Sequence, residues 1–283
     1  MTEQLAGIAR RLRVRARRDV TTSLTGAYRS AFRGQGLTFE ELRDYAPGDD
    51  VRWIEWNATA RLGRPIAKRM REERDLVLAL LVDVSPSLGC GRPDATKHDA
   101  LRRACAALAA AAIASQDRVA LALFGERLRR VLSPGTGPLQ RERVLHALEE
   151  SLSGERTDAG PALDWAAEKL PRHSVVVLLS DFLFPDPGAP LRRCASKHEL
   201  VALRVRDPSD EPPAQLPPVR VRAAEDRRAR VWRHSLEARR ALAAAIPEPT
   251  LRAVGADCGD LWTGARLLPS LLRFFEERAR RRA

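Results

Sequence analysis

The chain has 283 residues, of which 44% are hydrophobic and 30% are charged, and its formal net charge is +12 at pH 7. This composition is typical of a soluble globular protein, and the length suits one large domain or one domain with a small appendage. No apolar stretch approaches the roughly 18 residues needed to span a bilayer, and no signal-peptide core follows the N-terminal charges. The cysteines are widely separated and lack the paired spacing of a metal site, so we expect a reduced, cytoplasmic protein without a membrane span.

Nearly all of the positive charge is arginine, and it is spread along the whole chain. The excess of arginine and alanine is typical of a GC-rich genome and is a weak argument for nucleic-acid binding. The densest basic stretches, Arg10–Arg18 and Arg278–Arg282, are ordinary for solvated helix faces and frayed ends, although they could also touch an anionic surface. No helix-turn-helix or zinc motif accompanies them, so nucleic-acid binding is kept as the alternative function.

The first 75 residues differ from the rest. A short amphipathic helix is predicted from the apolar residues Leu5, Ile8, Ala9 and Leu12. A segment rich in glycine, arginine and tryptophan follows, and it is too small to have much core of its own. We therefore expect residues 1–75 to be an appendage that docks on a main domain formed by residues 76–283.

This segment also contains candidate partner-binding side chains, namely Asp49, Asp50, Trp53 and Trp56. Two alternatives remain open for them. The aspartates follow Pro-Gly, where Asp commonly bonds nearby backbone in a turn. The indoles suit either a core position or a contact with a partner.

The main domain begins with the apolar run of residues 76–82, which is typical of a strand buried on both faces of a parallel sheet. Strands then alternate with helices. We predict helices at 93–115, 138–152, 158–170, 235–246 and 265–280, and further strands at 118–124, 127–132, 174–179, 199–205 and 251–254. This order predicts an α/β fold with a doubly wound, Rossmann-like, mostly parallel sheet and one antiparallel edge at strand 127–132. A proline-rich loop followed by a hairpin at 219–232 predicts an insertion at about 207–234.

Side chains with hard oxygen atoms stand where three predicted segments leave this sheet. Asp83, Ser85 and Ser87 follow the first buried strand, Thr157 opens a helix, and Asp181 follows the second buried strand. If the two strands are neighbours, their carboxyl ends form one crevice at the point where the strand order reverses. Carboxylate and hydroxyl oxygens suit Mg²⁺ or Mn²⁺, and this set leaves a coordination position for a partner's oxygen.

Each of these residues has an ordinary alternative role. Ser85 or Ser87 could cap a helix, Thr157 could be an N-cap, and Asp181 could be a turn residue. An aspartyl nucleophile at Asp83 is a weaker alternative, because the second acid expected two positions later is Ser85. No Gly-x-Ser-x-Gly elbow and no phosphate-binding Gly-x-x-x-x-Gly-Lys occurs, so we expect a binding protein rather than a metal-dependent hydrolase or an ATPase.

The set Asp83, Ser85, Ser87, Thr157 and Asp181 resembles the metal-ion-dependent adhesion site of von Willebrand factor A domains. Residues 34–61 resemble the signature of a bacterial MoxR-associated family of unknown function (DUF number fifty-eight type), in which this signature precedes an A domain. The chain departs from the family pattern at Glu55, where Asp is expected, and at Leu88, where Met is expected. Both changes keep the chemical type.

The resemblance implies metal-dependent docking, in which an acidic residue of a partner completes the Mg²⁺ shell. It also implies that the shell can be coupled to movement of the last helix. By the same resemblance, the partner is a MoxR-type AAA+ ATPase, with this protein as its adaptor for a client protein.

Overall fold

The computed structural model describes residues 22–32, 37–47, 49–72, 76–92, 95–149, 157–210, 219–222, 229–232 and 248–282. Its centre is a six-stranded sheet with the order β12-β9-β8-β3-β6-β7. The strands are β3 (Val77–Asp83), β6 (Arg118–Phe124), β7 (Leu128–Gly135), β8 (Val175–Ser180), β9 (Glu199–Arg206) and β12 (Asp257–Trp262). All neighbours are parallel except β6 and β7. The predicted fold class, a mostly parallel α/β sheet with one antiparallel edge, is confirmed.

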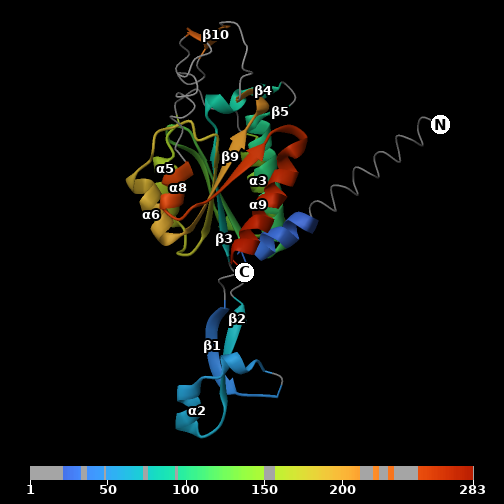
Figure 1. The fold of residues 1–283 in the computed structure, drawn as a ribbon, viewed down its shortest axis with the longest axis vertical. Helices are drawn as coiled ribbons and strands as arrows, with labels where there is room; N and C mark the ends of the chain where they lie inside the picture. Colours follow the sequence, from blue (N-terminus) through green and yellow to red (C-terminus); the bar gives the residue numbers. More distant parts are fainter. Residues whose placement is uncertain are drawn as a thin grey trace, which may run out of the picture.

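Helices cover both faces of this sheet (Figure 1). One face carries the helix at 22–32, α3 (Lys97–Ala114), α4 (Gly137–Ala147) and α9 (Leu267–Arg282). The other face carries α5 (Gly160–Lys169), α6 (Ala189–Lys197) and α8 (Glu248–Ala253). The central strand β3 supplies Leu78, Leu80 and Val82 to the first core and the intervening side chains to the second. A strand buried on both faces has no polar positions to alternate with, which explains its continuous apolar run.

The helix at 22–32 was not predicted. It buries Leu24, Tyr28, Ala31 and Phe32 against the last helix of the domain. The Phe32 ring packs edge-on against Phe275 at 5.4 Å and lies 4.3 Å from the Arg278 guanidinium. The amphipathic helix predicted from Leu5 to Leu12 lies outside the described residues.

The tryptophan-rich segment forms a small unit of its own. Strands β1 (Leu37–Asp44) and β2 (Ile66–Glu72) pair in an antiparallel hairpin, and η1 (Val51–Trp53) and α2 (Trp56–Leu62) lie between them in the chain. Figure 1 shows this unit projecting from the end of the sheet domain at which β3 begins. Its docking on the sheet domain remains a prediction, because the connecting residues 33–36 and 73–75 lie outside the described ones.

The predicted start of one helix needs correction. Helix α3 begins at Lys97 rather than near residue 93, because Thr96 and Asp99 form a capping box there. Strands β4 (Gly91–Arg92) and β5 (Ala95–Thr96) pair in the preceding turn.

The strand predicted at 251–254 is wrong, since these residues belong to α8 and the turn after it. Gly255 follows α8 with a left-handed φ of 82°, and β12 then forms the sheet edge. Helix α6 was not predicted.

The predicted hairpin at 219–232 is confirmed, as β10 (Val219–Arg222) pairs with β11 (Ala229–Trp232). The 3-10 turns η2 (Pro86–Gly89), η3 (Pro208–Asp210) and η4 (Gly264–Arg266) complete the described elements. The helix predicted at 235–246 lies outside the described part of the chain. Among the described helices, none combines the length and apolar character that crossing a bilayer requires.

Candidate metal site

The two buried strands that end in predicted site residues are neighbours in the sheet. Strands β3 and β8 run parallel, with Val82 opposite Leu179. Asp83 is the last residue of β3 and is fully buried, while Asp181 directly follows β8 and is 5% exposed. Because both strands end here, the two carboxylates lie close together at the carboxyl end of the sheet, as the alternation of strands and helices predicted.

Asp83 is held by hydrogen bonds to both of its carboxylate oxygens. The Ser85 backbone N–H donates to Oδ1 at 2.8 Å, and the Ser180 hydroxyl donates to Oδ2 at 2.5 Å. Burial raises the pKa of Asp83 to about 7, the neighbouring Asp181 charge also raises this pKa, and the two serines lower it. The result is a fixed carboxyl group that is costly to ionise without a cation beside it.

The two serines after β3 lie in the same cluster. The hydroxyls of Ser85 and Ser87 are 3.0 Å apart, and the Ser87 hydroxyl hydrogen-bonds the Asp181 carboxylate. Burial raises the pKa of Asp181, whereas Lys97 and the Ser87 hydrogen bond lower it, and the net direction is upward. Ser85 precedes η2 without a side-chain capping bond, so the capping alternative does not describe it.

Thr157 lies at the same carboxyl end of the sheet. The next residue, Asp158, donates its N–H to the Gly125 carbonyl at 2.8 Å, and Phe124 pairs with Asp83 in register. The N-cap alternative is wrong, because α5 starts at Gly160 and its N-cap position is Ala159.

Two buried oxygen atoms at this end of the sheet lack a hydrogen-bond partner in the described part of the chain, Thr157 Oγ1 and Asp181 Oδ2. Buried polar atoms are nearly always hydrogen-bonded, so these two oxygens are the atoms at this site that a bound ligand could satisfy. The donor set of carboxylates and hydroxyls suits a hard cation that keeps several waters. No group of three or more His, Cys, Asp or Glu side chains suited to a metal occurs among the described residues, so the hydroxyls are essential to this assignment.

Two residues of the cluster were missed, Ser180 and Lys97. Lys97 opens α3, is 3% exposed, and places its Nζ 2.6 Å from Asp210 Oδ1 and 3.6 Å from Asp181 Oδ2. Burial alone would lower the pKa of Lys97, but the two carboxylates outweigh it and raise the pKa of the ammonium. The available signal was composition, because lysine is rare in a chain whose cations are nearly all arginine.

The other candidate residues do not join this cluster. Asp49 accepts from the Ala46 N–H at 2.9 Å, and Asp50 caps η1 by accepting from the Arg52 N–H at 3.0 Å. Both aspartates therefore have the local turn roles that were left open as an alternative.

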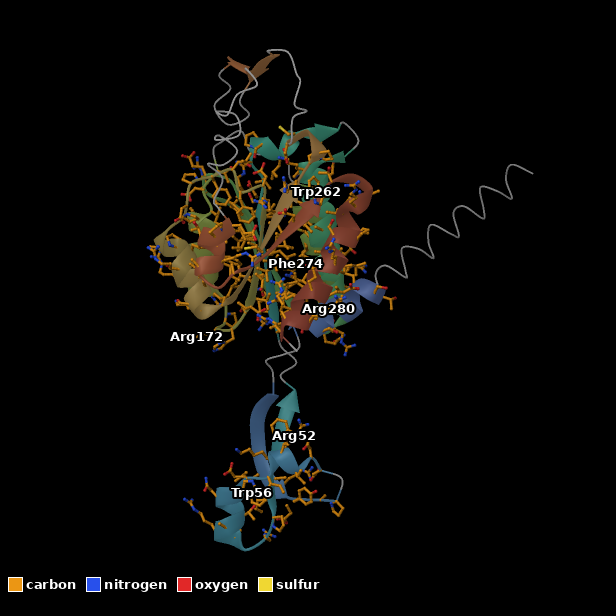
Figure 2. All side chains as sticks on the ribbon, viewed as in Figure 1. Arg52, Trp56, Arg172, Trp262, Phe274 and Arg280 are labelled. Atoms are coloured by element: carbon orange, nitrogen blue, oxygen red, sulfur yellow. The ribbon has the colours of Figure 1, made fainter. Side chains whose placement is uncertain are left out.

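Trp53 is half-buried, whereas Trp56 is 68% exposed on the small unit (Figure 2). Trp56 is therefore no core residue in this structure. Figure 1 shows the small unit beyond the end of the sheet at which β3 begins, whereas Asp83 is the last residue of β3.

Comparison with known proteins identifies the family. The family described as "Protein of unknown function DUF58" matches residues 41–249. The chain belongs to the DUF58 family. Uncharacterized proteins of Mycobacterium tuberculosis and Mycobacterium bovis are each 31% identical to this DUF58 protein over 98% of its length and 90% of their own.

Solved structures similar to this DUF58 protein include the conserved hypothetical protein BatB from Bacteroides thetaiotaomicron. BatB is 14% identical with a TM-score of 0.46, covering 72% of this chain and 99% of that one. The SpRpn10 VWA domain is 13% identical with a TM-score of 0.38, covering 70% and 93%. Similarity at this level carries no argument about function.

Proposed function

We propose that this DUF58 protein is a metal-dependent protein-interaction module without catalytic activity of its own. Asp83, Ser85, Ser87, Thr157 and Asp181 would hold one Mg²⁺ or Mn²⁺, directly or through water. The cation would have one open coordination position at the carboxyl end of the sheet. A carboxylate of a partner protein would occupy that position.

One observation carries this proposal: Thr157 Oγ1 and Asp181 Oδ2 are buried and have no hydrogen-bond partner within the described residues. Both residues lie at the carboxyl end of the sheet, where β3 ends in the buried Asp83. A divalent cation held by both residues would satisfy both oxygens and would offset the repulsion between the Asp83 and Asp181 carboxylates. Asp83 is fully buried and accepts two hydrogen bonds, which suits a positioned ligand better than a nucleophile that must reach a substrate.

The partner that we propose is a MoxR-type AAA+ ATPase, a client protein, or both, with this chain as the adaptor. This proposal is supported by the resemblance of the signature at 34–61 to the MoxR-associated family. The exposed Trp56 on the small unit would be a second contact point, on a part of the chain separate from the cation site. We propose a cytoplasmic location for this assembly.

The test is a binding measurement between the full-length protein and a purified MoxR-type ATPase from the same organism. We expect binding in Mg²⁺ that is lost in EDTA at fixed salt and weakened at least about tenfold by Ser85→Ala. Ser196→Ala, whose hydroxyl bonds the Arg193 carbonyl in α6, is the matched control and should bind like wild type. Binding that is indifferent to EDTA and to Ser85→Ala would contradict the proposal.

The same preparation tests the nucleic-acid alternative. Affinity for a DNA or RNA duplex that falls steeply with the logarithm of the salt concentration, and that ignores EDTA, would favour the basic surface over the cation site.

A further inference from the structure

We propose that Lys97 is a built-in competitor of the divalent cation, and that Asp210 sets the cation affinity by holding the Lys97 ammonium away from Asp181. This inference rests on the proposed cation site and adds the means by which that site is regulated.

The Lys97 ammonium lies between two carboxylates that come from different parts of the chain. It forms an ion pair with each of them: the Lys97 Nζ lies 2.6 Å from Asp210 Oδ1 and 3.6 Å from Asp181 Oδ2, and only the shorter contact is within hydrogen-bond distance. A buried ammonium needs a partner charge, so Lys97 stays close to at least one of the two. Asp181 Oδ2 accepts no hydrogen bond from the described residues, so it can accept one from Lys97, and a cation on Asp181 would meet the like charge of the Lys97 ammonium.

Asp210 is the member of this group that can respond to other parts of the protein. Its side chain is 18% exposed, against 4% for Lys97 and 3% for Asp181, and it is the last described residue before the insertion. When Asp210 holds the ammonium, Asp181 is available to the metal. When Asp210 is drawn away, Lys97 pairs with Asp181 and occupies the place of the cation.

Asp210 is also linked to the start of the last helix. Its Oδ2 accepts from the Asp207 N–H at 2.9 Å, and Asp207 Oδ2 accepts from the Thr263 hydroxyl at 2.5 Å. Thr263 is the N-cap of η4, which leads directly into α9. A shift of η4 can therefore change the position of Asp210, and through Lys97 the affinity for the cation.

The test is a calorimetric titration with Mn²⁺ alone, using the full-length wild type, Lys97→Met, Asp210→Asn and the double variant. We expect Lys97→Met to bind Mn²⁺ at least about tenfold more tightly, because the competing charge is gone, and Asp210→Asn to bind several-fold more weakly. In the Lys97→Met background, Asp210→Asn should change the affinity by less than about twofold. Lys169→Met, an exposed lysine at the end of α5, is the control and should bind like wild type.

The double variant is the decisive measurement. If the two charges acted on the cation independently, their removal would nearly cancel and the double variant would bind like wild type, which would overturn the inference. If Asp210 acts through Lys97, the double variant binds as tightly as Lys97→Met. The double variant loses one buried charge of each sign and so leaves no unpaired carboxylate at Asp210. It can therefore replace Lys97→Met in this comparison if circular dichroism shows that Lys97→Met alone does not fold.

The Mn²⁺ affinities of wild type and Lys97→Met distinguish a wrong role for Lys97 from a wrong cation site. If neither wild type nor Lys97→Met binds Mn²⁺, the proposed function is wrong and the inference falls with it. If wild type binds Mn²⁺ and Lys97→Met binds no more tightly, the cation site stands and Lys97 is only a structural ion-pair partner.

Discussion

The Ser180 hydroxyl donates to Asp83 Oδ2 at 2.5 Å and so joins the last residues of two neighbouring strands, 97 positions apart in the chain. The same hydroxyl accepts from the Phe182 N–H at 2.8 Å. Phe182 has a left-handed φ of 59° and is buried, so the chain turns sharply directly after Asp181. Ser180 therefore holds both the Asp83 carboxylate and the turn that follows Asp181, and Asp83 and Asp181 are the two carboxylates of the proposed cation site.

Replacing Ser180 by alanine should weaken cation binding as well as stability. Asp83 would lose a donor that lowers its pKa, so it would be less ionised near pH 7. We expect a loss of roughly 1–3 kcal/mol in the free energy of unfolding and at least about tenfold in Mn²⁺ affinity. Chemical denaturation and calorimetry measure the two effects.

Ser174→Ala is the matched control for this change. Ser174 is also buried, precedes the same strand at its other end, and donates to the Pro171 carbonyl at 2.6 Å. It should lose stability without losing Mn²⁺ affinity. Equal affinities in the two variants would show that Ser180 has no part in the site.

The stability of the metal-free protein should fall as pH rises from about 4 to about 7. The pKa of Asp83 is raised from 3.8 to about 7 in the folded state, so the native protein binds more protons than the unfolded chain in this window. The free energy of unfolding therefore decreases with pH until Asp83 is ionised. Asp83→Asn removes the titrating group, so in EDTA this contribution should be absent from its profile.

Magnesium should reverse this trend, because it binds the ionised carboxylate. The rise in Tm caused by Mg²⁺ should be larger at about pH 8 than at about pH 5.5, where Asp83 is protonated and the cation must displace its proton. A Mg²⁺ effect of the same size at both pH values would contradict the assignment of Asp83 as a ligand.

The helix at 22–32 should contribute to the stability of the sheet domain. Tyr28 is 1% exposed, and its hydroxyl donates to Asp117 Oδ2 at 2.9 Å. Tyr28→Phe should lower the free energy of unfolding by about 1–2 kcal/mol, because the buried Asp117 loses a donor. Tyr45→Phe, whose hydroxyl donates to the Asp49 carbonyl at 3.1 Å in the small unit, should cost less than about 0.5 kcal/mol. Similar losses in both variants would show that Tyr28 does not anchor the helix through this bond.

The parts of the site that sequence could predict are those whose position follows from local pattern. Burial on both sheet faces makes β3 and β8 continuous apolar runs, and the residue after such a run must lie at the carboxyl edge, which located Asp83 and Asp181. Lys97, Ser180 and Asp210 could not be located in this way, because their partners are distant in sequence and no spacing relates them.

Strand β12 and the helix at 22–32 were not predicted, because their apolar patterns are weak or masked by neighbouring residues. Strand β12 forms the sheet edge and has a single neighbour, so its residues are mostly half-buried and include Asp257 and Asp260, which hide the apolar pattern. The helix at 22–32 has its buried residues Leu24, Tyr28 and Ala31 at helical spacing, but it lies among glycine- and arginine-rich neighbours that suggested irregular structure.

The most direct test of the cation site is a calorimetric titration of Mn²⁺ into wild type and Asp83→Asn. Asparagine keeps the shape of the buried side chain and removes the charge that burial makes costly, so this variant should fold at least as well as wild type. Asp164→Asn, a carboxylate paired with Arg193 at 2.6 Å between α5 and α6, is the control. We predict one Mn²⁺ site in wild type and in the control, and at least about a hundredfold weaker binding in Asp83→Asn. Equal Mn²⁺ binding by all three proteins would contradict the assignment of this cluster as a metal site.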